Sequence, residues 1–412
     1  MGFGLRSLSK RERSWVLYDV GNSAYVMLAS TLIPIYFSAI VDPGSSAMVA
    51  WGYATTISSL LLALIMPFLG SLADLKGNKK KFLAGTIGTG AVSLALMGVP
   101  GDAMVFLVVY VFSSVMLNAS LVFYDAFLVD ATEEDRYDEV SSQGYAWGYI
   151  GSCIPFLICL LIVLFGENIG IDQLTGIRIS FVITAAWWVA FSVPIWRDVH
   201  QTHFKPREAN LFKRTIESLV NTCKKMVSDK RLGLYMLAYF FYIDGVHTII
   251  TMSTSYGTDL GIDSTQLVMA LLVTQVVAFP SAIAYGRLSA RFGTKKMLLV
   301  AIFAYFLITL FAAFLLRSAA EFWVLAVCVG MFQGGIQALS RSEFGKLIPK
   351  EHANEYYGFF DIFGKYATIM GTLLVSVFTQ FTGSSSIGVL SVSILFIVGF
   401  ILLLKMPEAE QE

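Results

Sequence analysis

Charged side chains are scarce in this chain. Only 14% of its 412 residues are Asp, Glu, Lys or Arg, where about 25% is usual in a soluble domain. The 29 basic residues balance the 29 acidic ones, so bulk charge indicates no nucleic-acid partner. We interpret the four cysteines, which have no paired spacing, as reduced packing residues. They are Cys153, Cys159, Cys223 and Cys328.

Motifs for catalysis and cofactor binding are also missing. The chain has no GxxxxGK[ST] segment, so we expect that ATP does not drive it directly. No Ser-His-Asp pattern stands out, and the four histidines form no ligand cluster for zinc. We therefore expect no enzyme, no cofactor and no metal.

Long apolar runs are abundant. The segments 297–316 and 387–404 are two of them, and neither contains a charged side chain. About 20 apolar residues cross the hydrocarbon layer as a helix, and these runs lack strand alternation. The sequence therefore predicts an all-α polytopic membrane protein. Twelve spans are expected, at 15–40, 47–73, 82–99, 104–130, 140–165, 178–196, 231–256, 264–290, 297–316, 320–346, 355–380 and 385–405.

Basic residues gather in alternate loops, which predicts the orientation. Lys76, Lys79, Lys80 and Lys81 follow the second span, and a second basic group follows the eighth. Cytoplasmic loops carry the excess of Lys and Arg, so both termini should be cytoplasmic. The second group consists of Arg287, Arg291, Lys295 and Lys296.

The expected domains follow from these spans. Residues 1–14 are a cytosolic arm, 15–196 and 231–405 are two six-helix bundles, and 406–412 are a cytosolic tail. The polar segment 197–230 is a cytoplasmic linker. Its apolar residues have helical spacing, which predicts an amphipathic helix on the inner leaflet; a soluble linker helix is the alternative. These residues are Phe212, Ile216, Leu219, Val220, Cys223, Met226 and Val227.

One charged stretch occurs twice, once in each half of the chain. GSLADLKGNKKKFL starts at Gly70, and the related stretch GRLSARFGTKKMLL starts at Gly286. An internal repeat of this size is typical of secondary transporters. Gly70 and Gly77 permit close approach, and Asp74 can reach a neighbouring helix N-terminus. We predict that the stretch is a loop latch rather than the substrate site.

The repeated stretch resembles the loop signature of the major facilitator superfamily, G-x-L-x-D-x-x-G-[RK]-[RK]. The second copy has Ala290 where Asp is expected, which predicts a weaker latch. The resemblance implies two bundles around a central cavity, lined by the first, fourth, seventh and tenth spans, and alternating access. The matching residues are Gly70, Leu72, Asp74, Gly77, Lys79 and Lys80, and Gly286, Leu288, Gly293, Lys295 and Lys296.

A narrower resemblance lies in WVLYDVGNSAY, FYDAFLVD, SSQGYAWGYIG, YFFYIDGVHTI and QGGIQALSRSEFGKLIP. These stretches resemble the vacuolar amino-acid effluxer family linked to autophagy and its bacterial relatives. The resemblance implies export of amino acids, chiefly leucine-like and aromatic ones. Val20, Asp125 and Val129 stand where the family usually has Trp, Asn and Pro.

Ionisable residues inside the predicted spans are functional candidates because they are costly there. Asp19 and Asn22 share a helical face, either as a polar pair for substrate or as a cap near the cytosol. Asp244 and His247 share a face in mid-span and could carry a proton. A buried His hydrogen-bonded to a neighbouring helix is the alternative.

Asp125 and Arg341 are separated by the same offset as the two copies of the repeated stretch, so they occupy equivalent places in the two halves. They could close a gate, Arg341 could hold a substrate carboxylate, or they could be a permanent ion pair. Tyr124 and Tyr242 add aromatic surface for a small ligand. We expect structural or gating pairs for the remaining charges, Asp130, Glu343, Lys346, Asp361 and Lys365.

The sequence thus predicts a secondary transporter of a small solute, with the resemblance favouring efflux of a neutral amino acid. Protons and membrane lipids are the other expected partners. The compact chain favours a bacterial inner membrane. The alternatives are a transporter of a lipid or amphipathic drug, and a solute receptor that does not transport.

Overall fold

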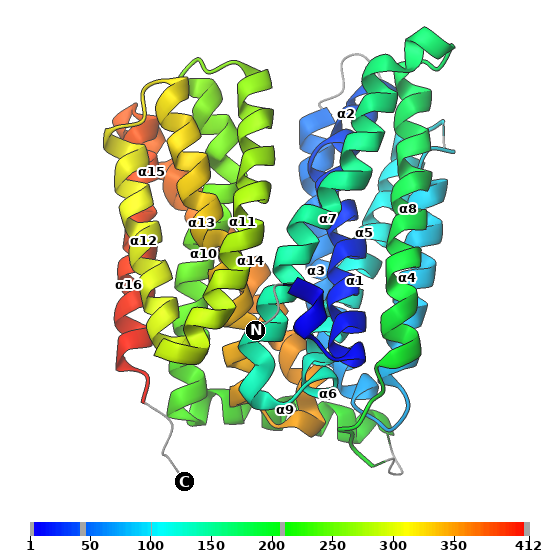
Figure 1. Cartoon of the computed structure of the whole chain (residues 1–412), viewed down its shortest axis with the longest axis vertical. Helices are drawn as coiled ribbons and strands as arrows, with labels where there is room; N and C mark the ends of the chain where they lie inside the picture. The colour runs from blue at the N-terminus through cyan, green and yellow to red at the C-terminus, as the bar shows by residue number, and fades with distance from the viewer. Residues whose placement is uncertain (1–3, 42–46, 100, 207–210, 408–412) are drawn as a thin grey trace. The chain divides into compact units, whose positions relative to one another are not determined.

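The structure is a computed structural model, and it describes residues 4–41, 47–99, 101–206 and 211–407. Helices make up nearly all of it (Figure 1), and these residues contain no strand beyond one isolated bridge. The first half holds α1 (Lys10–Ser30), α2 (Leu32–Ile40), α3 (Ala47–Ala73), α4 (Lys79–Leu96), α5 (Ala103–Ala126), α6 (Leu128–Ala131), α7 (Tyr137–Phe165) and α8 (Gln173–Asp198).

The second half begins with the linker helix α9 (Leu211–Ser228), so the predicted linker helix is present. It continues with α10 (Lys230–Asp259), α11 (Ser264–Phe292), α12 (Thr294–Phe314), α13 (Ala319–Leu347), α14 (Ala353–Thr382), α15 (Ser385–Ser391) and α16 (Ser393–Lys405). Short 3₁₀ segments lie at Gly4–Ser7, Glu134–Arg136, Gly166–Ile169 and Lys350–His352.

Local sequence signals explain several helix starts. Ser9 and Glu12 form a capping box at the start of α1, in which each side chain bonds to the other's backbone N–H. Asp102, Asp172 and Asp229 cap α5, α8 and α10 in the same role. The polar residues at these boundaries therefore fix where the apolar helices begin.

Eleven helices in the described part are long and apolar enough to cross a membrane. They coincide with eleven of the predicted spans, and α4 occupies the place of the third. Three lysines open this helix of 18 residues, so its uncharged part is short. The prediction of an all-α polytopic membrane protein with twelve spans is confirmed.

The chain divides into two compact units. Unit 1 comprises Met1–Glu133, Trp147–Ile216 and Lys350–Gly358, and unit 2 comprises Glu134–Ala146, Glu217–Pro349 and Phe359–Glu412. In unit 1, α8 packs on α1 and α4, and α5 packs on α3 and α4. In unit 2, α13 packs on α11 and α12, and α16 packs on α10 and α12. Each unit thus takes a short helical segment from the opposite half of the sequence.

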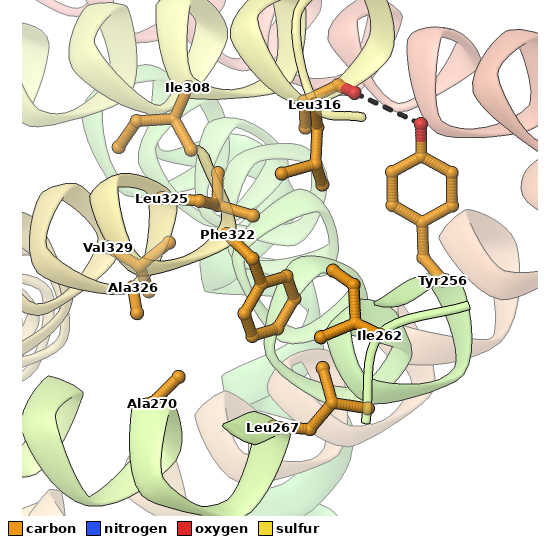
Figure 2. Close-up of a cluster of buried hydrophobic side chains, with 11 residues drawn as sticks. Tyr256, Ile262, Leu267, Ala270, Ile308, Leu316, Phe322, Leu325, Ala326 and Val329 are labelled. Carbon is orange, nitrogen blue, oxygen red and sulfur yellow. Dashed lines mark hydrogen bonds between the residues drawn. The ribbon is translucent and has the colours of Figure 1, made fainter. Parts of the chain in front are cut away.

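An apolar cluster consolidates one end of unit 2 (Figure 2). Phe322, Leu325 and Val329 of α13 lie among apolar side chains of α10, α11 and α12. The hydroxyl of Tyr256 donates to the carbonyl of Ala312 at 3.0 Å, which satisfies the one polar group of that ring. This cluster joins four helices of the unit without leaving that hydroxyl unpaired.

The contact between α11 and α13 depends on a glycine. A Cβ placed on Gly335 would lie 2.2 Å from the Cγ of Tyr285, at the base of that ring. Close helix approach in membranes is typical of small residues at such positions. The ring cannot swing away from this point, because the clashing atoms are next to its own Cβ.

We expect the G335A variant to lower the thermal stability of the protein in detergent. Over-packing a buried contact typically costs about 1–3 kcal/mol. The matched control is G88A, because a Cβ on Gly88 of α4 would meet nothing within 4 Å. Equal melting temperatures for the two variants would contradict this account of the α11–α13 contact.

Candidate functional site

A buried carboxylate and a tyrosine form the centre of a polar cluster in unit 1. Asp19 of α1 is 6% exposed, and its Oδ2 accepts a hydrogen bond of 2.8 Å from the hydroxyl of Tyr124 on α5. Its Oδ1 accepts a bond of 3.1 Å from Asn22, one turn along α1. The predicted Asp19–Asn22 pair therefore exists, and Tyr124 belongs to it.

Aromatic rings pack around Tyr124, which donates to this carboxylate. Trp15 stacks on Tyr124 with ring centroids 4.3 Å apart, and its indole N–H donates to the Tyr124 carbonyl. Tyr18 lies against the same ring at 4.6 Å and is hydrogen-bonded to Ser120. A buried acid beside a cluster of aromatic rings is suited to an organic ammonium group.

Unit 2 has a buried cation instead. Arg341 of α13 is 3% exposed and donates to the side chain and the carbonyl of Ser141, at 2.9 and 3.0 Å. Its guanidinium lies over the ring of Tyr145, 4.4 Å from the centroid. Ser141 and Tyr145 belong to the first turns of α7, and sequence reasoning did not connect them with Arg341. A guanidinium held in this way suits a carboxylate ligand.

Asp125 follows Tyr124 at the end of α5 and is half-buried in unit 1. Arg341 belongs to unit 2, so the predicted pairing of Asp125 with Arg341 stays a prediction. Tyr242 of α10 shares a hydrogen bond of 2.7 Å with the hydroxyl of Ser340, the residue before Arg341. Tyr235 donates to the Ser340 carbonyl, so two tyrosines of α10 hold this part of α13.

Asp244 is buried between α10 and α14. Its Oδ1 accepts hydrogen bonds from the Gly371 N–H at 2.9 Å and from Thr248 at 3.3 Å. Its Oδ2 is buried and has no partner among the described residues. A carboxylate buried in this way is costly, and protonation removes the charge.

His247 lies one turn further along α10. It approaches the backbone of Gly364 and the ammonium of Lys365 on α14. Lys365 in turn forms the predicted pair with Asp361, at 2.5 Å. Asp244 and His247 thus both face α14, through different partners, and proton exchange between them stays a prediction.

The loop after α3 contacts the start of α14 in unit 1, and its role as a latch stays a prediction. Oδ1 of Asp74 accepts from the backbone N–H and the amide of Asn354, at 2.9 and 2.7 Å. Its Oδ2 accepts from the Glu355 N–H at 3.1 Å. These N–H groups open α14, so the carboxylate caps that helix. A Cβ on Gly70 would lie 2.5 Å from the Asn354 carbonyl, which explains the glycine.

The linker segment before α9 completes the latch, and the sequence did not predict this. Lys205 pairs in parallel with Leu75 as an isolated bridge, and its ammonium lies 2.6 Å from Glu355 and 3.9 Å from Asp74. Gln201 accepts from the N–H of Gly77, whose φ of 77° gives the tight turn its left-handed conformation.

A second buried ion pair lies beside the latch. Lys79 and Asp130 are both 0% exposed at the side chain and 2.7 Å apart, as the sequence predicted for Asp130. Thr202 and His203 of the linker donate their backbone N–H groups to Asp130. Burial acts to raise the pKa of Asp130, but Lys79 and the hydrogen bonds outweigh it and hold the pKa well below its usual range.

At the second copy of the loop, the carboxylate comes from the contacting helix α7 and not from the loop. Gly286 lies close to the start of α7, as Gly70 lies close to the start of α14. A Cβ added at Gly286 would come within 2.7 Å of the Ser142 side chain. Asp138 of α7 accepts from Thr294, Ser342 and Lys346, at 2.6, 2.6 and 2.7 Å. The predicted weaker latch therefore keeps an acid, although Ala290 has replaced the one in the loop.

The repeat itself contained a signal for this exchange. Asp138 and Asn354 are separated by the same offset along the chain as Gly70 and Gly286. One latch thus has its acid in the loop and an amide on the helix, and the other has its acid on the helix. The remaining loop residues lie around these contacts: Lys80 stacks over Trp196, Arg287 is exposed, and Gly293 has a φ of 89° before α12.

A small cavity of about 40 Å³ lies within unit 2, between α10, α11 and α13. Its lining is mostly apolar, with Phe322 and Val329 at its wall and Gln333 among its few polar groups. No group of three His, Cys, Asp or Glu that could hold a metal ion occurs in the described ranges.

Replacing Asp74 should have a pH-dependent effect on thermal stability. Burial raises the pKa of Asp74 to about 6, against the opposing attraction of Lys205 and Lys79. The folded state then binds this proton more tightly than the unfolded state, so stability is lost as pH rises from about 4 to 6. We expect D74N to be less stable by about 1–3 kcal/mol, because the Glu355 N–H loses its acceptor.

The melting temperature of the wild type should therefore exceed that of D74N by more at pH 5 than at pH 7. The control is D135N, which changes an exposed carboxyl near α7 and should match the wild type at both values. A wild-type advantage that grows towards pH 7 would contradict the raised pKa.

Comparisons with known proteins agree with this architecture. The family model described as "Vacuole effluxer Atg22 like" matches residues 45–411. The MFS-type transporter YxiO of Bacillus subtilis (strain 168) is 45% identical over 413 residues, covering 98% of this chain and 96% of its own. Autophagy-related protein 22 of Kluyveromyces lactis is 23% identical, covering 83% of this chain and 75% of its own.

Solved structures support the fold alone. The transporter FucP, in the outward conformation, has a TM-score of 0.73 at 12% identity, covering 96% of this chain and 98% of its own. The human organic anion transporter MFSD10 has a TM-score of 0.72 at 14% identity, covering 95% and 97%. The family model and the Bacillus subtilis relative show that the chain belongs to the Atg22-like family, within the major facilitator superfamily of membrane transporters.

Proposed function

We propose that this transporter exports a neutral amino acid across a bacterial plasma membrane. The observation that carries the proposal is Arg341, a buried guanidinium on α13 that donates to Ser141 of α7 and lies over the ring of Tyr145. Such a group recognises a carboxylate in a planar, bidentate geometry. The similarity to a family described as vacuole effluxers, and to a Bacillus subtilis relative, supports the direction and the membrane.

Asp19 is a separate candidate recognition group within unit 1. Its carboxylate is held by Tyr124 and Asn22, and Trp15 and Tyr18 provide aromatic faces nearby. An α-ammonium group is attracted both to the carboxylate and to the aromatic faces. Within unit 1, Asp19 is thus suited to an ammonium group, and Asp125, which follows Tyr124, is proposed to tune this preference.

Proton coupling would proceed through Asp244. Its Oδ2 is buried and has no partner among the described residues. The ionised form of Asp244 is therefore costly in these surroundings, and the protonated form is not. A conformational change that alters the surroundings of α10 and α14 would therefore take up or release a proton. His247, one turn away, is the group proposed to relay it.

A lipid or an amphipathic drug is the alternative solute. The apolar cavity of about 40 Å³ in unit 2 is too small to hold either of them.

Counterflow in proteoliposomes tests the proposal. Vesicles are preloaded with a mixture of neutral amino acids, and labelled leucine or tyrosine is added outside. We expect accumulation above that of empty liposomes, and a loss of apparent affinity of at least tenfold in R341Q, since a buried charge-assisted bond is worth roughly 1.5–3 kcal/mol.

The control for this substitution is R291Q, which changes an exposed guanidinium near the end of α11. It should keep wild-type counterflow. No exchange of any amino acid by folded wild-type protein would reject the amino-acid proposal in favour of the amphipathic solute.

The D244N variant tests the coupling. Asparagine keeps the hydrogen bonds of Oδ1 but cannot bind and release a proton. We expect D244N to retain solute exchange and to lose accumulation driven by a pH gradient. D259N is the matched control, because it changes an exposed carboxyl at the end of the same helix, and it should keep this accumulation. Accumulation by D244N at the wild-type level would remove Asp244 from the mechanism.

A further inference from the structure

The linker helix α9 has an exposed apolar stripe. Ile216, Val220 and Val227 are 45%, 47% and 85% exposed, and their spacing of four and seven residues puts them on one face of the helix. Thr222 and Met226, on an adjacent face, are buried against unit 2. The helix therefore packs on the protein along one side and presents apolar side chains along another.

The end of α9 is fixed to the start of a membrane span. Asp229 alone separates α9 from α10, and its side chain caps α10 by accepting from the N–H groups of Arg231 and Leu232. Gly233 lies so close to α9 that a Cβ would come within 2.9 Å of the Met226 carbonyl. This tight corner joins the last turns of α9 directly to α10, whose residues Lys230–Ser253 are long and apolar enough to cross a membrane.

The charge around the stripe is basic. Lys224 and Lys225 are exposed on the last turns of α9, and Lys230 is exposed at the first turn of α10. An interfacial helix typically combines an apolar face with Lys or Arg on its polar side. Each such cation near an anionic membrane surface contributes about 1 kcal/mol of attraction.

We propose that α9 is a lipid-binding element whose stripe of Ile216, Val220 and Val227 inserts into the headgroup boundary of an anionic phospholipid leaflet. Lys224, Lys225 and Lys230 bind the lipid phosphates. An anionic bilayer fits the stripe for two reasons: α9 is joined directly to a helix that can span the membrane, and the exposed lysines beside the stripe are opposite in charge to the lipid phosphates. The linker between the two halves is then held at the membrane surface.

Spin labels at chosen cysteines of the full-length protein test this proposal in liposomes. The background C223S/C328A keeps the two buried cysteines, Cys153 and Cys159. One label is placed by V227C on the stripe, and a control label by N221C on the exposed polar side of α9. Collision rates with oxygen, which concentrates in the bilayer, are compared with those of a water-soluble nickel chelate.

We expect the ratio of oxygen to nickel collisions to be several-fold higher for V227C than for N221C in vesicles containing phosphatidylglycerol. The ratio for V227C should fall when phosphatidylcholine replaces that lipid, and K224Q/K225Q should reduce this dependence. Equal ratios at both positions would overturn the proposal. A V227C label shielded from both reagents would also overturn it, because protein would then cover the stripe.

A second measurement guards against a misfolded labelled variant. Wild-type protein and V220E/V227E, which need no label, are compared for their stabilisation by added phosphatidylglycerol in detergent. We expect the lipid to raise the melting temperature of the wild type more than that of V220E/V227E. N221E serves as the matched control and should respond as the wild type does. An equal response of V220E/V227E would overturn the proposal.

Discussion

Charge that is buried must be paired inside the protein, and the contacts among the loop after α3, the linker and the start of α14 depend on this constraint. Asp74, Asp130 and Glu355 are nearly inaccessible to solvent, and Lys79 and Lys205 lie among them. Removing one member of such a group leaves its partners desolvated and unpaired, which costs far more than the pair itself contributes. The linker and the loop after α3 are therefore held in one arrangement by the same few charges.

The two repeats meet this constraint with different residues. Asp74 caps the start of α14 from the loop, whereas Asp138 reaches back from the start of α7 to Thr294 and Lys346. Both contacts keep the close glycine approach, at Gly70 and at Gly286. The geometry of the contact is thus shared between the halves, while the position of the acid is not.

The polar centres within the helices differ between the two units, and this asymmetry is the basis of the proposed function. Unit 1 has an acid among aromatic rings, and unit 2 has a guanidinium and a separate acid. Within unit 2, Arg341 is the group proposed to hold a carboxylate, and Asp244 is the group proposed to bind the coupling proton.

The sequence by itself determined the apolar spans, the repeat and the individual charged candidates, because hydropathy, spacing and the cost of burying charge are local properties of the chain. It also predicted the pairs within one helix or one turn, such as Asp19 with Asn22 and Asp361 with Lys365. Only the tertiary structure decided which distant residues meet. Three contacts join residues that are far apart in the sequence: Lys205 with Glu355, Ser141 with Arg341, and Asp138 with Thr294. No periodicity specifies how helices so widely separated along the chain pack.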